Sequence, residues 1–154
     1  MVARHQWNSP YMHLTVTSAD MDESVEFLDC VVGIEMDKIN LKEKFSRFSE
    51  RWSPKVIAEM NDYQFKLVKI EGEFVWHEHP HTDEVFIVIE GKMCIDFKEY
   101  TVELNEGEMY VVPKGMRHKP YAAEECRVML IEPRGVVNTG EDEGELTAPN
   151  NVWV

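Results

Sequence analysis

The chain has 154 residues, of which 44% are apolar and 29% charged, and its net charge is -13 at pH 7. This length suits one main domain around a single hydrophobic core. No stretch approaches the roughly 20 consecutive apolar residues that span a bilayer. The negative charge repels nucleic-acid phosphates and anionic lipid, so neither a nucleic acid nor a membrane is expected as a partner.

The first ten residues, MVARHQWNSP, lack the apolar stretch of a signal peptide, and we therefore expect a cytoplasmic protein. Cys30, Cys94 and Cys126 are odd in number and widely spaced, without a CxxC pair. This pattern argues against a disulfide framework and against a zinc knuckle. Buried free thiols are the expected state of the three side chains.

Two short helices are predicted in the first 55 residues. In segment 18–33, small apolar residues recur on one helical face, and Gly33 can supply the left-handed residue that ends a helix. In segment 40–52, Asn40 can cap the first turn, large apolar residues recur at helical spacing, and Pro54 prevents continuation. Such an apolar stripe is typical of core packing.

From residue 63 onward the pattern changes to short β-type runs separated by glycine, proline and charged residues, which predicts an all-β sandwich or barrel. Strand 84–90, EVFIVIE, is apolar on both of its faces and must be covered on both. The second cover would come from the N-terminal helices or from another subunit, so we expect a homodimer. The predicted strands are 63–70, 73–79, 84–90, 92–97, 100–104, 108–113 and 126–132.

The chain therefore divides into three parts. An N-terminal extension with two short helices spans residues 1–55, a β-barrel spans 56–134, and a C-terminal tail spans 135–154. The tail has several glycines and the acidic run EDEGE but no periodicity, which predicts a solvated excursion. Its last three residues, 152–154, are apolar enough to pack back on the barrel.

Histidines are concentrated in the sequence WHEHPHTDE. On a strand, residues i and i+2 share a face, so His77 and His79 can point to the same side. The chain then turns, and Glu84 opens the next strand on that side. Much later, Pro113 and Gly115 favour a tight turn before His118, which can face the first cluster if the sheet closes.

Two segments resemble the paired motifs of the cupin superfamily. GEFVWHEHPHTDEVFIVIEG resembles the first motif, and GEMYVVPKGMRH, which ends at His118, resembles the second. The resemblance implies a small single-domain protein of the conserved-barrel cupin 2 type, with a jelly-roll β-barrel and one divalent metal ion. The implied metal ligands are His77, His79, Glu84 and His118.

The sequence departs from the cupin pattern in small ways. Four residues separate Gly72 from His77 where the usual pattern has five, and Ala122 stands where many members carry asparagine. His81 is an alternative ligand, because it would share a face with His79 on an unbroken strand. Pro80 interrupts that strand, so we place His81 at the rim of the site.

Three imidazoles and a carboxylate suit manganese, iron, nickel or zinc and leave positions open for a substrate or water. A buried carboxylate among imidazoles is costly unless a cation neutralises it, which also favours a metal. The sequence does not distinguish among these metals.

A second, fainter resemblance involves the N-terminal segment 13–35. It resembles the opening strand and helix of the vicinal oxygen chelate superfamily, which includes the glyoxalases, and His13 falls where many members have a metal ligand. The rest of that βαβββ module does not follow in the sequence. We therefore interpret His13 as structural and expect only a strand followed by a helix here.

The expected function is that of a metalloenzyme acting on a small oxygen-rich metabolite, with a dioxygenase or another oxidoreductase as the leading hypothesis. A sugar isomerase or epimerase is an alternative within the cupin resemblance, because fold does not determine reaction. A non-catalytic module that binds a metal or a small molecule is a further alternative. No separate catalytic residue is assigned, although Tyr110, Lys114 and Arg117 lie near the second motif.

Overall fold

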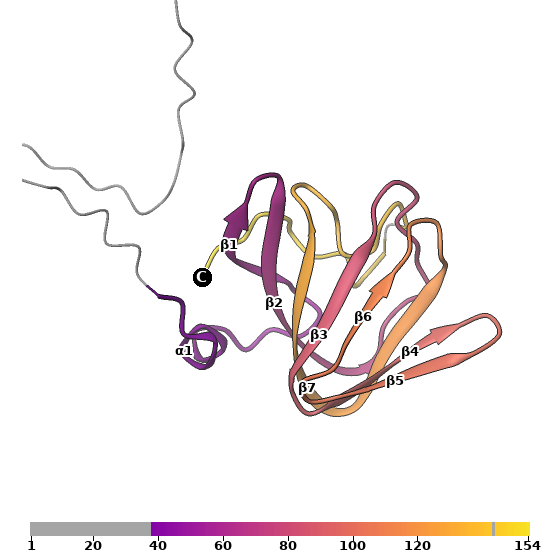
Figure 1. Cartoon of the computed structure of the whole chain (residues 1–154), viewed down its shortest axis with the longest axis horizontal. Coiled ribbons are helices and arrows are strands. Elements are labelled where there is room, and N and C mark those ends of the chain that lie inside the picture. Colours follow the sequence, from indigo (N-terminus) through magenta and orange to yellow (C-terminus); the bar gives the residue numbers. More distant parts are fainter. Residues whose placement is uncertain (1–37, 143) are drawn as a thin grey trace, which may run out of the picture. The chain divides into compact units, whose positions relative to one another are not determined.

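The computed structural model describes residues 38–142 and 144–154, which form an antiparallel β-structure preceded by one short helix (Figure 1). This confirms the predicted all-β class. The helix is α1 (Leu41–Ser46), and the strands are β1 (Lys55–Met60), β2 (Tyr63–Glu73), β3 (Glu84–Glu90), β4 (Lys92–Phe97), β5 (Thr101–Asn105), β6 (Met109–Val112) and β7 (His118–Pro133).

The strands pair in the order β1-β2-β7-β3-β6, while β4 pairs with both β7 and β5. β7 belongs to both halves of the structure, because residues 118–121 pair with β4 and residues 126–133 pair with β2. The register between β2 and β7 shifts between Ile70 and Gly72, where the strands bend. A long strand shared between two layers gives the predicted jelly-roll barrel.

The alternation of side chains along each strand fills the barrel interior. On β3, Glu84, Phe86 and Val88 are buried, whereas the residues between them are half-buried. Phe86 and Val88 join the main core cluster with residues of β2, β4 and β7. Burying each large apolar side chain stabilises the fold by about 1.5–3 kcal/mol. The same two-residue period directs Glu84 into the barrel.

A second apolar cluster lies where α1 packs on the sheet. Phe45 of α1 and Phe48, which follows the helix, pack with Ile57 and Leu67 of β1 and β2. Leu67 has no exposed surface. The helix therefore covers one end of the outer face of the sheet.

The helix predicted over 40–52 is shorter than expected and ends at Ser46. Trp52 has a φ of 57°, which is left-handed and incompatible with a continuing helix. Its backbone N–H donates instead to the carbonyl of Lys69 on β2 (2.9 Å). The apolar spacing of this segment reflects packing against the sheet rather than additional helical turns.

The strand predicted at 73–79 is not formed. β2 ends at Glu73, and beyond it only an isolated bridge joins His77 to His118. The segment still runs beside the start of β7, since the N–H of Phe74 donates to the carbonyl of Pro120 (3.0 Å). β1 was not predicted. Its sequence, KVIAEM, has no turn residues and no clear alternation to mark it as a strand.

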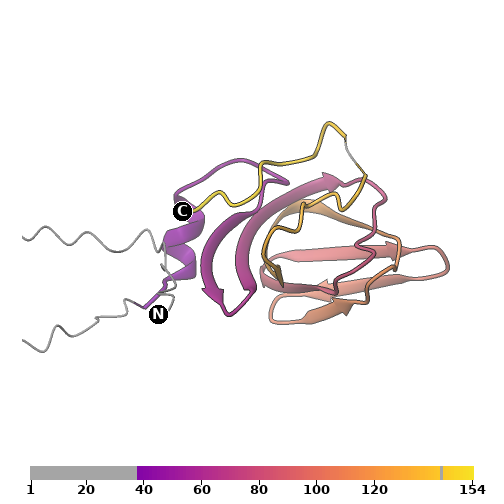
Figure 2. The same ribbon diagram turned by 90° about the horizontal axis from the view of Figure 1, so that it is seen from above.

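The C-terminal segment returns along the barrel to β1 and α1 (Figure 2). The N–H of Val56 donates to the carbonyl of Val152 (2.7 Å), and the N–H of Val154 donates to the carbonyl of Val56 (3.2 Å). We predicted that this segment would be exposed to solvent. The prediction is wrong at Thr139, which is 1% exposed.

Several predicted features lie outside the described residues, namely the helix at 18–33, His13 and Cys30. Cys94 is half-buried and Cys126 is buried, and both are free thiols. Burial raises the pKa of the Cys126 thiol to about 11, so it is neutral at physiological pH. Within the described part of the chain, no helix is long and apolar enough to cross a membrane.

Candidate metal site

Four polar residues meet inside one end of the barrel. His77 and His79 lie in the loop between β2 and β3, Glu84 is the first residue of β3, and His118 is the first residue of β7. The backbones of His77 and His118 exchange two hydrogen bonds of 3.0 and 2.9 Å, which fixes the loop beside β7. All four side chains are buried, with exposed fractions between 0% and 5%.

The Glu84 carboxylate lies at the centre of this group. Its Oε2 atom is 3.3 Å from the Nε2 atom of His79 and 3.3 Å from the Nε2 atom of His118. The rings of His77 and His118 are 4.3 Å apart between centroids. One ligand atom from each of His77, His79 and Glu84 lies within 4.8 Å of the others, a spacing that could hold a metal ion.

Backbone carbonyls orient two of the imidazoles. Nδ1 of His77 lies 3.1 Å from the carbonyl oxygen of Val75, and Nδ1 of His118 lies 2.9 Å from that of Met116. A carbonyl only accepts hydrogen bonds, so Nδ1 carries the proton in both contacts. The Nε2 atoms of both rings are then unprotonated and available as ligands in the neutral side chains.

Three buried atoms in this group have no hydrogen-bond partner, namely Nε2 of His79, Oε2 of Glu84 and Nε2 of His118. The 3.3 Å contacts between them lack hydrogen-bond geometry, and orphaned buried polar atoms are rare and costly. Two ligands at about 2.1 Å from one ion are separated by about 3.0–3.4 Å for angles between octahedral and tetrahedral. The donor set and its spacing therefore fit a shared metal ion.

The surroundings of the group favour a neutral imidazole at His77 and an ionised carboxylate at Glu84. Burial lowers the pKa of His77 to about 4, although the charge of Glu84 acts in the opposite direction. Burial tends to raise the pKa of Glu84, but the polar contacts of its carboxylate with the imidazoles of His118 and His79 outweigh burial and hold that pKa well below its usual range. Without a metal the carboxylate is thus already ionised at neutral pH.

The pKa of His79 is raised, because its interaction with the Glu84 carboxylate outweighs the effect of burial, which lowers it. A protonated His79 can pair with Glu84 when no metal is bound. A metal ion that binds there must therefore displace this proton.

A cavity of about 30 Å³ adjoins the Glu84 carboxylate. A water molecule needs roughly 10–15 Å³ of such space, so the cavity has room for about two waters or a similarly small group. Among its described lining residues, only Glu84 is ionisable. The lining comprises Trp52, Pro54, Val68, Ile70, Phe74, Glu84, Phe86, Pro120, Leu130 and Asn138.

Trp52 and Asn138 line this cavity and were not predicted as site residues. The Trp52 ring stacks on Phe74 at 4.8 Å between centroids. The Asn138 side chain donates to the carbonyl of Trp52 (3.0 Å) and accepts from the N–H of Ala148 (2.9 Å). Asn138 lies in a segment without periodicity, so the sequence alone offered no signal for its position.

The C-terminal segment also contacts the ligand loop directly. A Cβ atom on Gly140 would lie 2.0 Å from the carbonyl oxygen of Glu78 and 3.5 Å from Nδ1 of His79. Gly140 has a φ of 62°, a conformation that side chains disfavour. Nearby, Arg117 donates to Asp142 (3.1 Å) and to the carbonyl of Trp76 (3.1 Å). The segment thus rests on the backbone that carries two of the imidazoles.

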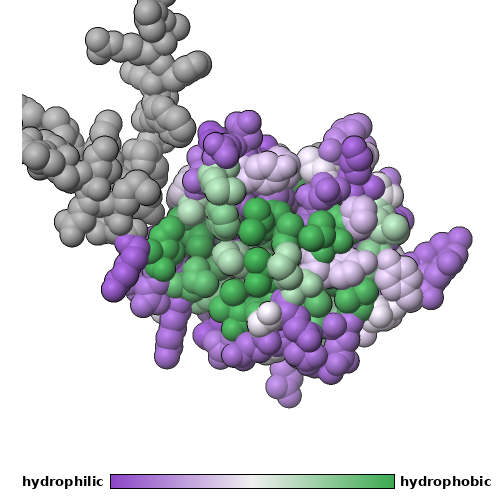
Figure 3. All heavy atoms as spheres, in the orientation of Figure 1, coloured by the Kyte–Doolittle hydropathy of each residue, from purple (hydrophilic) through white to green (hydrophobic). Residues whose placement is uncertain are grey.

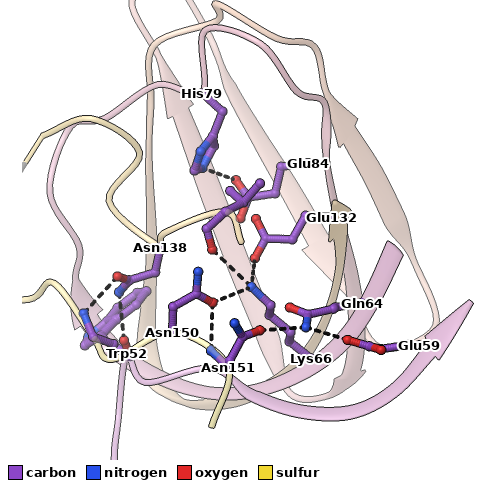
Figure 4. Close-up of polar contacts among 12 residues, drawn as sticks. Trp52, Glu59, Gln64, Lys66, His79, Glu84, Glu132, Asn138, Asn150 and Asn151 are labelled. Carbon is purple, nitrogen blue, oxygen red and sulfur yellow. Dashed lines mark hydrogen bonds and ion pairs between the residues drawn. The ribbon is translucent and has the colours of Figure 1, made fainter. Parts of the chain in front are cut away.

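Figure 4 shows a buried polar network that continues from the site along the barrel interior. Glu132 lies near Glu84, and its carboxylate accepts from Nζ of Lys66 at 2.8 Å. Both side chains are at most 3% exposed. Nζ of Lys66 also donates to the carbonyl of Val136 (3.1 Å) and to Asn150 (3.5 Å), which ties the C-terminal segment to the barrel.

The pKa of Glu132 is raised to about 7, because burial and the charge of Glu84 together outweigh the opposite effects of Lys66 and His79. The alternating strand pattern placed Lys66 and Glu132 in line with apolar inward residues. That inward position conflicts with their charge, and the conflict was the signal that could have revealed the pair.

His81 is exposed and is not one of the residues of the group. Tyr110 is half-buried and lies 3.5 Å from Tyr100 between hydroxyl oxygens, while the side chains of Lys114 and Arg117 are exposed. None of these three lines the cavity beside Glu84.

The sequence and the structure both match known proteins of one family. The family model described as "Cupin domain" matches residues 65–133. The crystal structure of a cupin-2 domain containing protein from Shewanella frigidimarina is 67% identical, covers 62% of this chain and 94% of that chain, and has a TM-score of 0.62. The chain belongs to the cupin superfamily.

Curated relatives match over shorter parts of their length. The uncharacterized protein YdbB of Bacillus subtilis is 41% identical over 80 residues, which are 51% of this chain and 65% of YdbB. The putative germin-like protein 9-2 of Oryza sativa is 40% identical over 69 residues, which are 42% of this chain and 32% of that protein. The chain thus spans less than two thirds of both relatives.

Proposed function

We propose that the chain binds one divalent transition-metal ion through His77, His79, Glu84 and His118. The proposal rests on three buried atoms without hydrogen-bond partners, namely Nε2 of His79, Oε2 of Glu84 and Nε2 of His118. The Glu84 oxygen lies 3.3 Å from each of the two nitrogens. A cation between them would satisfy all three atoms and neutralise the buried carboxylate. Manganese, iron, nickel and zinc all accept such a mixed imidazole and carboxylate set.

We further infer that the site belongs to a metalloenzyme that acts on a small oxygen-rich metabolite. When bound, the ion would supply Lewis-acid or redox chemistry. The chain holds the ion with its imidazoles, balances its charge with Glu84, and excludes bulk water with the apolar lining of the cavity. The cavity of about 30 Å³ beside Glu84 has room for about two waters or a similarly small polar group.

The lining favours oxidation over isomerisation. Sugar isomerases and epimerases require a general acid or base that moves a proton on the substrate. Among the described lining residues, only Glu84 ionises, and it is committed to the proposed metal. A dioxygenase or another oxidoreductase reaction depends less on such a group, because the ion itself would carry the chemistry.

A second candidate, a non-catalytic binding module for the metal or a small molecule, is favoured by the small volume of the same cavity. All four proposed ligands are buried, and Trp52 and Asn138 line the space beside Glu84. A site that only stores or senses an ion needs no larger opening.

The two candidates separate in one experiment on the purified full-length chain. Its metal content is measured, the protein is loaded with manganese, iron, nickel or zinc, and oxygen uptake is followed on a panel of keto acids and diols. One redox-active ion per chain with substrate-dependent oxygen uptake supports the oxidoreductase. One ion per chain with no uptake supports the binding module. If no ion binds, the metal site itself is wrong.

A further inference from the structure

Arg117 stands directly before the proposed ligand His118, and its guanidinium contacts two other segments of the chain. Its Nη2 atom donates to the backbone carbonyl of Trp76 (3.1 Å), and its Nη1 atom donates to the carboxylate of Asp142 (3.1 Å). Trp76 stands directly before the proposed ligand His77. One side chain therefore joins the backbones that carry two of the four ligands, and ties the C-terminal segment to both.

A half-exposed arginine would ordinarily be a solvated surface charge. Figure 3 shows apolar side chains gathered over the strands and hydrophilic ones around the margins of the molecule. The side chains of Arg117 and Asp142 are 53% and 47% exposed, and an ion pair of this kind contributes little to the stability of a fold. The hydrogen bond to Trp76 differs, because its acceptor is a backbone group one residue away from a ligand.

Segment 74–79, which carries His77 and His79, does not form a strand. It is held to segment 115–120 by four hydrogen bonds between backbone groups. Among the described residues, Arg117 is the only side chain that adds a hydrogen bond between these two segments. The backbone donors are the N–H groups of Phe74, His77, Gly115 and His118.

The contact of Arg117 with Asp142 holds the C-terminal segment near the same loop. Two residues before Asp142, Gly140 lies so close to segment 74–79 that an added Cβ atom would overlap the carbonyl oxygen of Glu78. Glu78 lies between the two imidazole ligands of this segment. Arg117 thus acts on the segment directly at Trp76, and through the C-terminal segment at Glu78.

We propose that Arg117 is a positioning residue of the metal site, which holds the backbone around His77 at the spacing from His118 that a shared ion requires. This inference rests on the proposed function, because it concerns the same four ligands. A residue that orients a metal ligand typically changes metal affinity by about 10–100-fold. The lower end of this range is expected for Arg117, because water competes for the hydrogen bonds of a half-exposed guanidinium.

The sign of the effect separates positioning from simple electrostatics. The positive charge of Arg117 repels a divalent cation, so charge alone predicts that Arg117→Gln binds zinc more tightly than the wild type. Positioning predicts the reverse, and we expect about 10-fold weaker binding. Arg117→Lys keeps the charge but replaces the planar fork with one ammonium group, so its affinity should lie between those of the wild type and Arg117→Gln.

The test measures the zinc affinity of the purified full-length protein by competition with a chelator of known affinity. The cobalt-loaded protein adds a spectroscopic readout, because its visible absorption depends on coordination geometry and should change in Arg117→Gln. Arg47→Gln is the matched control. Arg47 is also half exposed, at 50%, and its ion-pair partner Glu43 lies on α1. This control should keep the wild-type affinity and spectrum.

Amide hydrogen exchange of the metal-free protein tests the positioning without an ion. The N–H groups of His77 and His118 should exchange about 10-fold faster in Arg117→Gln than in the wild type or Arg47→Gln, because they join the two segments. If Arg117→Gln loses its β-type circular dichroism, Arg117→Lys serves in its place.

The outcomes distinguish the inference from the proposed function. A wild type that binds no zinc would contradict the proposed function, and the exchange at His77 and His118 would still decide the role of Arg117. Zinc binding by Arg117→Gln that is as tight as in the wild type, or tighter, would overturn the inference. Unchanged exchange at both amides would overturn it as well.

Discussion

The carboxylate of Glu84 and the imidazole of His118 approach to 3.3 Å although they lie on different strands, 34 positions apart in the sequence. Neither facing atom has a hydrogen-bond partner. The pairing depends on β7, which begins at His118 and is bonded through its backbone to His77. The site is thus assembled by the closure of the barrel rather than by one local motif.

His77→Ala and His118→Ala should each abolish stoichiometric metal binding in the purified full-length protein. Removing an outer hydrogen-bond partner of a ligand weakens metal affinity by about 10–100-fold, so removal of a ligand should weaken it by at least that factor. Inductively coupled plasma mass spectrometry gives the metal content. His81→Ala is the matched control, because His81 is exposed and outside the group, and it should retain wild-type metal.

Metal affinity should fall as the pH falls. The pKa of His79 is raised by Glu84, so below that pKa the ion competes with a proton and its affinity drops about tenfold per pH unit. The pKa of His77 is lowered to about 4, so His77 remains a neutral ligand through this range. Calorimetric titration with zinc between pH 5 and pH 8 measures the slope, and a pH-independent affinity would contradict the assignment of His79.

The metal-free protein should also lose stability as the pH falls from 6.5 toward 4 through the contribution of His77. In this interval the unfolded chain binds a proton at His77 while the folded chain does not, so protonation favours unfolding. The shift corresponds to about 3 kcal/mol at its full extent. Nuclear magnetic resonance of the imidazole nitrogens checks the premise directly, with a midpoint near pH 4 expected for His77.

Lys66→Met should destabilise the protein by about 3 kcal/mol, because it leaves the Glu132 carboxylate buried without its cation. The pKa of Glu132 is already raised to about 7, so the carboxyl can take up a proton at low pH. The loss should therefore be larger at pH 8 than at pH 6 in urea unfolding. The double variant Lys66→Met, Glu132→Leu should recover most of the stability, and equal losses in single and double variants would show that the pair is not the cause.

Gly140→Ala should weaken metal binding by about 10–100-fold, because a Cβ atom would force the C-terminal segment away from the backbone of Glu78 and the ring of His79. The left-handed φ of 62° adds a cost of about 1–2 kcal/mol to folding. Gly144→Ala is the control, since no atom lies within 4 Å of its added Cβ. Equal zinc affinity in the two variants would mean that the contact with the ligand loop has no influence on the site.

Local patterns in the sequence point to three of the four proposed ligands, and the full set, with Glu84, is implied by the resemblance to the cupin motifs. The two-residue spacing of His77 and His79, and the turn residues before His118, are local signals in the sequence. The structure keeps both imidazoles inward although the strand assumed for them is absent. Backbone bonds to β7, rather than the pleat of a strand, hold His77 in place.

The residues around the proposed ligands could not be predicted in the same way. Trp52 belongs to an apolar spacing that mimics a helix, and its left-handed backbone depends on contacts with β2. Asn138 and Gly140 lie in a segment whose position depends on distant partners such as Lys66. Tertiary contacts of this kind leave no period in the sequence. The outer face was predictable in part, since strand 84–90 is apolar on both sides.

The most direct test of the metal site is a crystal structure of the full-length protein with anomalous diffraction data collected at the manganese, iron, nickel and zinc edges. We predict one anomalous peak per chain, at about 2.0–2.2 Å from Nε2 of His77, His79 and His118 and from the carboxylate of Glu84. The absence of an anomalous peak among these four side chains, after crystals have been soaked in each metal, would contradict the assignment. A peak at another place in the protein would not rescue it.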